Sequence, residues 1–234
     1  MRKKVLRGIG LVSALSVGED GYSNLLDYRI YAKKQDGKTK LQLAWEMIER
    51  SRAQIVLFDS WYASRDLISC LQEIGKRFYS TLPGNRIFYD EKGKKHRVED
   101  YQFTEQELKE GKLIQLNKLN FMVRIFCIFV RKGGTEIIIT NDIAQNSLEE
   151  ILNMMSLRWK VEEFHREIKQ LTGIEQCQAR KSRIQRNHIC CCLMAWQFLK
   201  TEAWKRQVTV YLLHESQSDD FIRSQLLKPN LKFA

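Results

Sequence analysis

Proline, paired cysteines and long apolar runs are scarce in this sequence of 234 residues. Only two prolines occur, so no proline-rich linker divides the chain. No stretch approaches the ~20 consecutive apolar residues of a membrane-spanning helix. The opening segment imitates a secretory signal, but its apolar run is short and alternates as a strand does. We therefore expect neither a membrane protein nor a secreted one.

Cysteine is present but not in a pattern that indicates disulfides. Three of the six cysteines are consecutive, at positions 190–192, and no Cys-x-x-Cys pair exists. Within an apolar stretch such residues behave as small hydrophobes, which favours a reducing, cytoplasmic setting. A zinc site built from Cys177, His188 and the triplet is an alternative, although the spacing lacks a metal-ligand pattern.

Charge of one sign dominates the sequence. It has 39 Lys and Arg against 28 Asp and Glu, which gives a formal net charge of +11. The fractions of hydrophobic residues (44%) and charged residues (29%) are ordinary for a globular protein. The excess indicates a polyanionic partner, most often nucleic acid, or else a basic but unspecialised surface. The length predicts one sizeable core with an insertion.

Hydrophobic periodicity predicts an α/β protein with a mixed sheet flanked by helices. We divide it into a first core part (residues 1–77), a β-rich insertion (78–132), a second core part with the last sheet strand and a long helix (133–175), and a basic helical region (176–234). Strands are expected at residues 9–17, 25–32, 55–58 and 136–140, and helices at 39–52, 65–76, 148–171 and 184–205. Ser64 is a predicted N-cap, and Ser147 with Glu150 a predicted capping box.

Two places in this pattern carry acidic residues of interest. Asp59 follows the unbroken apolar run at 55–58, and ligand sites of open α/β sheets lie at such strand ends. Its alternative role is simply to end the strand. The second place is the helix predicted at 148–171. Five of its residues follow one another at steps of three, four, four and three positions, so they would share one face of the helix: Met155, Arg158, Glu162, Arg166 and Lys169. The alternative there is an amphipathic helix with solvated ion pairs.

The stretches FDSWY and RWKVEEFHREIKQLTGIEQCQARK resemble the DDE transposases of bacterial insertion sequences, specifically the insertion-sequence-four group. That group has a tyrosine–arginine–glutamate–lysine signature with two, three and six residues between its members. Arg158, Glu162 and Lys169 match it, whereas Met155 stands at the tyrosine position. Asp59 matches the group's second aspartate, followed by the aromatic residues Trp61 and Tyr62. The group also has a β-rich insertion between the second aspartate and the glutamate.

The resemblance implies an RNase-H-like catalytic domain that cleaves and joins DNA at transposon ends by two-metal chemistry. Asp59 and Glu162 would be the catalytic and metal-binding residues, with Mg²⁺ as cofactor and Mn²⁺ as a substitute. Double-stranded DNA, both transposon end and target, would be the partner, and the intact protein is compatible with a homodimer. Contacts to DNA are expected from Arg158, Arg166, Lys169, Trp61, Tyr62, Arg180, Lys181, Arg183 and Arg186. A prokaryotic cytoplasm, in association with the nucleoid, would be the location.

One part of the pattern is not found. The first catalytic aspartate of an RNase-H-like fold lies on a first, central strand, but residues 9–17 match the second strand, and no acidic residue precedes them. We therefore expect a catalytic-domain fragment that lacks its first strand and is inactive as it stands. The alternatives are a non-catalytic DNA-binding remnant of a decayed element and an RNase-H-like nuclease, the latter disfavoured by the insertion and the motif spacing.

Overall fold

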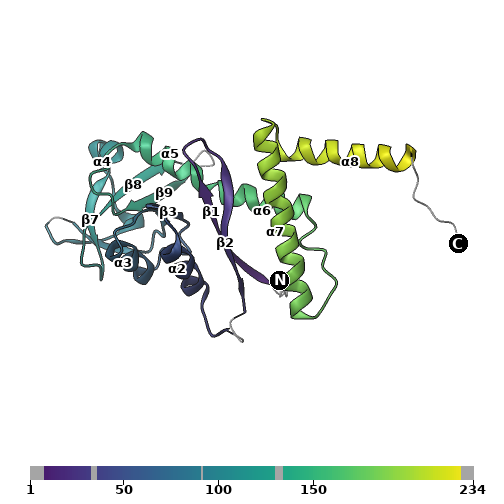
Figure 1. Ribbon diagram of the computed structural model, residues 1–234. Coiled ribbons are helices and arrows are strands. Elements are labelled where there is room, and N and C mark those ends of the chain that lie inside the picture. Colours follow the sequence, from purple (N-terminus) through teal and green to yellow (C-terminus); the bar gives the residue numbers. More distant parts are fainter. Residues whose placement is uncertain (1–7, 33–35, 91, 130–133, 228–234) are drawn as a thin grey trace, which may run out of the picture. The chain divides into compact units, whose positions relative to one another are not determined.

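The computed structural model describes residues 8–32, 36–90, 92–129 and 134–227 (Figure 1). The chain forms two compact units. The first contains the described residues up to 12 together with residues 31–159, and the second contains residues 13–30 and those from 160 onward. Each unit has its own packing and is described separately.

The first unit is built on one sheet. Its strands lie in the order β3 (Ile55–Phe58), β4 (Arg77–Leu82), β9 (Thr135–Thr140), β8 (Val123–Phe129), β7 (Lys112–Leu116), β5 (Ile87–Tyr89) and β6 (Lys95–Arg97). β3 and β4 are parallel, and the remaining pairs are antiparallel. The strands expected in the β-rich insertion thus extend the same sheet through β8 and β9. Our division of the chain into four parts stays a prediction.

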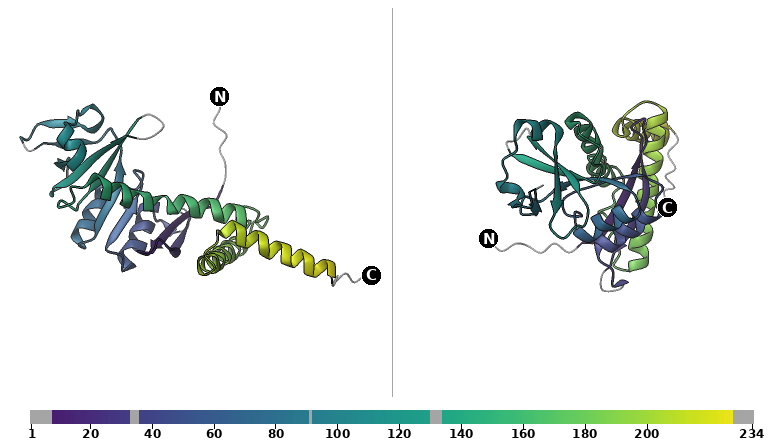
Figure 2. Two further views of the ribbon diagram at one scale, coloured as in Figure 1. Left: turned by 90° about the horizontal axis from the view of Figure 1, so that it is seen from above. Right: turned by 90° about the vertical axis from the view of Figure 1, so that its left-hand side faces the viewer.

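Alternating side chains give this sheet two buried faces. On β9, Ile137 and Ile139 belong to one apolar cluster, whereas Ile138 belongs to another. The helix α3 (Arg65–Glu73) contributes three buried residues to the first cluster, and α5 (Leu148–Arg158) contributes Ile151 and Met155 to the second. The helix α2 (Lys40–Arg50) also packs against the first cluster. The predicted mixed sheet flanked by helices is therefore confirmed (Figure 2).

Side-chain caps define where the helices of this unit begin. The predicted N-cap is confirmed at Ser64, whose hydroxyl accepts from the Leu67 backbone, while α2 begins with a complete Thr39–Gln42 capping box. At α5 only half of the predicted box forms. Ser147 accepts from the Glu150 backbone, but the Glu150 carboxylate accepts from the side chain of Gln145 instead.

Residues 148–171 are helical as predicted, except for an interruption at Trp159. α5 ends at Arg158, and α6 (Lys160–Leu171) begins one residue beyond Trp159. The Trp159 amide donates to the Ser156 carbonyl at 3.2 Å, an i to i−3 bond that tightens the last turn. The two units also meet in sequence at this residue. The common face predicted from Met155 to Lys169 is therefore divided between two helices.

The second unit contains most of a hairpin, residues 13–30, together with helices. β1 (Gly10–Val17) pairs with β2 (Ser23–Tyr31), and α7 (Ser182–Lys205) holds the hairpin through polar side chains. The Leu25 amide donates to Gln197 at 2.8 Å, and Tyr22 and Thr201 share a hydrogen bond of 2.9 Å. A last helix, α8 (Val210–Leu227), lies within the predicted helical region 176–234 but beyond the helix predicted at 184–205. It packs its first turn against α7.

A buried ion pair joins α6 to α7. Glu167 is only 7% exposed, and its carboxylate accepts from Lys200 at 3.0 Å and from the indole of Trp196 at 2.8 Å. The ring of Trp196 in turn meets Phe164 edge-on at 4.8 Å. Because these contacts satisfy the buried carboxylate in one geometry, they fix the rotation of α6 on α7.

We predict that Lys200→Met lowers the free energy of unfolding by about 3 kcal/mol, because Glu167 would remain buried without its cation. Urea unfolding of the whole chain measures this change. Lys205→Met is the matched control: its partner Glu202 forms an exposed i,i+3 pair, and the expected loss is below about 1 kcal/mol. Equal losses in the two variants would contradict a structural role for the buried pair.

Candidate functional site

Asp59 lies where β3 ends at one edge of the sheet. Because β3 and β4 are parallel, their carboxyl ends meet at the same edge, and the hydroxyl of Ser80 on β4 donates to the Asp59 carbonyl at 3.3 Å. The carboxylate itself is exposed. The position expected for a ligand-binding carboxylate in an α/β sheet is thus occupied by the predicted residue.

The Asp59 side chain also holds the turn that follows. Its Oδ1 accepts from the backbone of Trp61 at 2.9 Å and of Tyr62 at 3.4 Å. This turn leaves Trp61 58% exposed, with the Tyr62 ring edge-on to it at 4.8 Å. Burial and, second, the Asp59 charge raise the pKa of the Tyr62 hydroxyl above its ordinary value. The aspartate therefore both ends the strand and presents an aromatic side chain to solvent.

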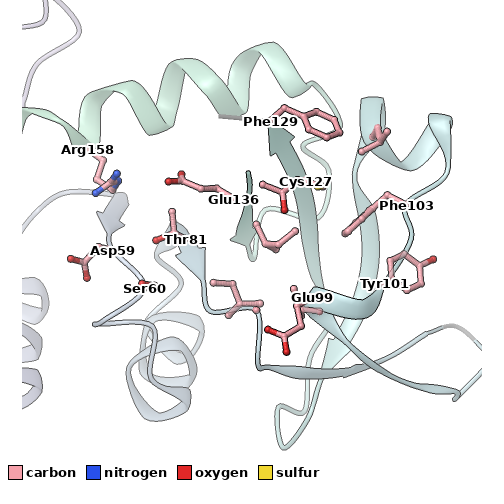
Figure 3. A pocket seen from close by; sticks show the side chains of 16 residues that line it. Asp59, Ser60, Thr81, Glu99, Tyr101, Phe103, Cys127, Phe129, Glu136 and Arg158 are labelled. Atoms are coloured by element: carbon pink, nitrogen blue, oxygen red, sulfur yellow. The ribbon is translucent and has the colours of Figure 1, made fainter. Parts of the chain in front are cut away.

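A cavity of about 660 Å³ opens beside Asp59 within the first unit (Figure 3). Arg158 at the end of α5 lines it together with Asp59 and Thr81, and Tyr101, Phe103 and Phe129 form its other side. The Arg158 guanidinium also lies 5.2 Å from the centre of the Trp159 ring. The cavity thus joins a carboxylate and a cation to an aromatic wall from the β-rich segment.

The predicted motif residues beyond Trp159 belong to the second unit. Glu162, Arg166 and Lys169 are exposed on α6, while Phe164 and Ile168 are buried on its opposite side. Lys169 pairs with Glu175 at 3.0 Å. Glu163, the residue after Glu162, forms an ion pair with Lys160 at 3.0 Å.

A basic cluster surrounds the start of α7. It comprises Arg180, Lys181, Arg183 and Arg186, all exposed. The N-cap residue Lys181 forms no side-chain cap, so the first amides of α7 point outward with the positive end of the helix dipole. This arrangement is suited to anionic groups such as phosphates.

The structure brings only some of the predicted site residues together. Asp59, Trp61, Tyr62 and Arg158 belong to the first unit, whereas Glu162 and the basic residues of α6 and α7 belong to the second. Convergence of Asp59 with Glu162 therefore stays a prediction. Among the described residues, no group of three or more His, Cys, Asp and Glu is placed to hold a metal ion. All six cysteines are free.

Two acidic residues of the cavity escaped sequence analysis. Glu99 follows β6, and Glu136 lies on β9; both line the cavity with Asp59. Glu99 stands in a short polar segment and Glu136 at the start of the predicted strand 136–140, neither with distinctive spacing, and only the sheet pairing brings them near Asp59. No local signal in the sequence would have identified them.

Comparison with known proteins identifies the family. The sequence profile described as "Transposase DDE domain" matches residues 11–198, and the chain belongs to this family. No curated protein matches the chain. Among solved structures, a piggyBac transposase synaptic complex with hairpin DNA is similar at 9% sequence identity and a TM-score of 0.49, covering 96% of this chain and 55% of that one. The chain thus spans about half the length of that transposase.

The helices were also searched for membrane spans. Within the described ranges, none combines the length and the apolar character that crossing a bilayer requires.

We predict that Asp59→Asn leaves the stability of the chain nearly unchanged, because an amide oxygen can still accept from the Trp61 and Tyr62 backbones. Asp59→Ala removes that acceptor and should cost about 1 kcal/mol. Thermal and urea unfolding of the two variants test the difference. A loss as large for asparagine as for alanine would mean that the charge, rather than the turn, is what Asp59 contributes to stability.

Proposed function

We propose that this chain is the catalytic part of a DNA transposase of the insertion-sequence-four group, which cleaves and joins phosphodiester bonds at transposon ends. The observation that carries the proposal is Asp59 at the end of a parallel strand, beside a cavity that Arg158 also lines. Membership of the transposase DDE domain family supports it. A guanidinium in that cavity is suited to hold a scissile strand by a phosphate close to the carboxylate.

Asp59 and Glu162 are the carboxylates that we assign to the reaction. Their proposed ligand is Mg²⁺, with Mn²⁺ as a substitute, because hard cations prefer a few carboxylates and retain water. Such a cation, when bound, would supply charge stabilisation for phosphoryl transfer. Among the described residues no three His, Cys, Asp or Glu side chains are grouped to hold a metal ion. The proposal therefore requires an arrangement in which Glu162 and a further carboxylate join Asp59.

The remaining predicted residues are proposed to bind DNA. Arg166 and Lys169 share the exposed face of α6 with Glu162, so they are suited to hold phosphates near that carboxylate. Arg180, Lys181, Arg183 and Arg186 would contact the duplex backbone, and Trp61 and Tyr62 would contact DNA beside Asp59. The net charge of +11 supports these contacts. A homodimer and a prokaryotic, nucleoid-associated location are part of the same proposal.

We predict salt-sensitive binding of duplex DNA with little sequence preference. Each neutralised phosphate contributes about 0.9 to the slope of log affinity against log salt, so Arg183→Gln with Arg186→Gln should lower that slope by nearly two. Fluorescence anisotropy at several salt concentrations gives the slope. Lys92→Gln with Lys95→Gln, two exposed lysines of the first unit, removes equal charge as a control. Affinity that ignores salt would argue against the proposal.

The first catalytic aspartate is proposed to lie on a strand that is not among those described. The support is that β3, an unbroken apolar strand whose side chains pack against both apolar clusters, occupies the edge of the sheet. Among the described strands none pairs with its outer edge. Apolar strands of this kind are typical of sheet interiors. The same observation favours the second candidate function, a non-catalytic DNA-binding remnant.

We predict that the chain as given does not cleave transposon-end DNA in Mg²⁺ or Mn²⁺, and that adding a preceding strand ending in aspartate restores cleavage. In the restored protein, Glu162→Gln should abolish cleavage and leave DNA binding nearly intact. Glu163→Gln should retain most activity, because that side chain is directed about 100° away around the helix and bonds Lys160. Cleavage assays on labelled ends decide this. The reverse ranking of the two variants would mean that Glu163, and not Glu162, is the catalytic glutamate.

A further inference from the structure

One side of α7 carries exposed apolar residues along its middle. Met194 is 67% exposed and Phe198 59%, and Ile184 and Cys191 are exposed as well. Positions 187–199 contain no Asp, Glu, Lys or Arg, although 29% of the residues in the whole chain are charged. A water-facing helix surface that lacks charge over more than three turns is unusual, and such surfaces mark sites of contact.

These residues follow a heptad spacing. Ile184, Cys191 and Phe198 are seven positions apart, and Asn187 and Met194 stand at the intermediate positions. Since seven residues make nearly two helical turns, alternate steps of three and four form one straight stripe. We call these five residues the α7 stripe. Its pattern is that of a seam between two helices.

The rest of the second unit contacts other sides of α7. The hairpin binds Gln197 and Thr201, α6 binds Trp196 and Lys200, and α8 packs against Leu199. At 3.6 residues per turn, the α7 stripe is centred about 80° around the helix from the hairpin side and about 180° from the α6 side. The stripe is therefore separate from the surfaces that hold this unit together.

We propose that the α7 stripe is the surface on which a second copy of this chain packs, with the two α7 helices antiparallel. In this arrangement Met194 of one copy lies opposite Cys191 of the other, and Phe198 lies opposite Asn187. The proposed function includes a homodimer but assigns no surface to it. The inference goes beyond that function, because it depends neither on DNA cleavage nor on the catalytic carboxylates.

The stripe is complementary to itself in this register. Each of the two central layers places a larger side chain opposite a smaller one, Met194 opposite Cys191 and Phe198 opposite Asn187. Side chains that alternate in size interdigitate across a seam and leave few voids. A two-fold axis uses the same surface on both copies, so a stripe that matches its own reverse is suited to a second copy.

The charges of α7 favour the antiparallel orientation. The basic cluster formed by Arg180, Lys181, Arg183 and Arg186 lies at the start of the helix. A parallel pair would set two such clusters side by side. An antiparallel pair separates them by about 30 Å along the seam, well beyond the screening length of about 8 Å. It also opposes the two helix dipoles and leaves each cluster open to DNA.

Sedimentation of the whole chain without DNA tests the proposal. Because the seam is short, we expect a dimer with a dissociation constant on the order of 10 µM. Phe198→Glu should weaken it roughly thirtyfold or more and Phe198→Ala roughly tenfold, since each change occurs twice across the two-fold axis. Phe221→Glu is the matched control, because Phe221 on α8 is 65% exposed and lies outside the stripe. It should leave the association unchanged.

A pair of charges tests the register. Cys191→Glu and Met194→Lys should each weaken the dimer, because each sets a charge against an uncharged side chain of the partner. Combined in one chain, the two changes bring opposite charges together across an antiparallel seam, and association should recover about tenfold over either single variant. A parallel seam would bring like charges together, so a double variant weaker than both single ones would overturn the proposed register.

The outcomes distinguish this inference from the proposed function. A native chain that stays monomeric at about 200 µM overturns the inference, as does a dimer that Phe221→Glu disrupts and the stripe variants do not. Melting temperatures show which variants are folded, and Phe198→Ala serves where the charged variant melts lower. Monomeric stripe variants should still bind duplex DNA through the basic cluster. A native chain that dimerises through the stripe but binds no duplex at low salt supports the inference and contradicts the proposed function.

Discussion

The parallel pairing of β3 with β4 is the constraint on which the site in the first unit depends. It ends both strands at one edge of the sheet and sets Asp59 there, backed by Ser80. The register pairs Phe58, the last residue of β3, with Ser80, so Asp59 is the residue that follows the strand. The cavity, the turn that exposes Trp61 and the contact of the Lys40 ammonium with the Trp61 ring all follow from where that strand stops.

Trp159 separates the two helices that carry the signature residues, α5 and α6. Arg158 ends α5, whose buried residues pack on the sheet, whereas Glu162 belongs to α6, which is held to α7 by Glu167 and Trp196. One residue with φ −63° and ψ −16° separates the helices. The boundary between the two units therefore falls inside the signature, between Arg158 and Glu162.

How much could be predicted from the sequence depended on the range of the interactions involved. The run at 55–58, the N-cap Ser64 and the position of Asp59 follow from local pattern and were confirmed. The break at Trp159 and the burial of Glu167 were not foreseen, because helical periodicity continues through both positions and only tertiary packing distinguishes them. The placement of Glu99 and Glu136 beside Asp59, and of Lys40 beside Trp61, required the sheet order and the chain's path, which no local spacing encodes.

The carboxylates near Asp59 would repel DNA that approaches this residue. Asp59, Glu99 and Glu136 line one cavity, and three carboxylates repel a phosphate backbone. Charges farther away than the screening length of about 8 Å at physiological salt offset that repulsion only weakly, so a net charge of +11 spread over the chain is not sufficient. Cations close to Asp59 must act instead, and Arg158 and Lys40 are two that the first unit supplies there. Their placement around an acidic site explains why a strongly basic protein still requires individually positioned cations.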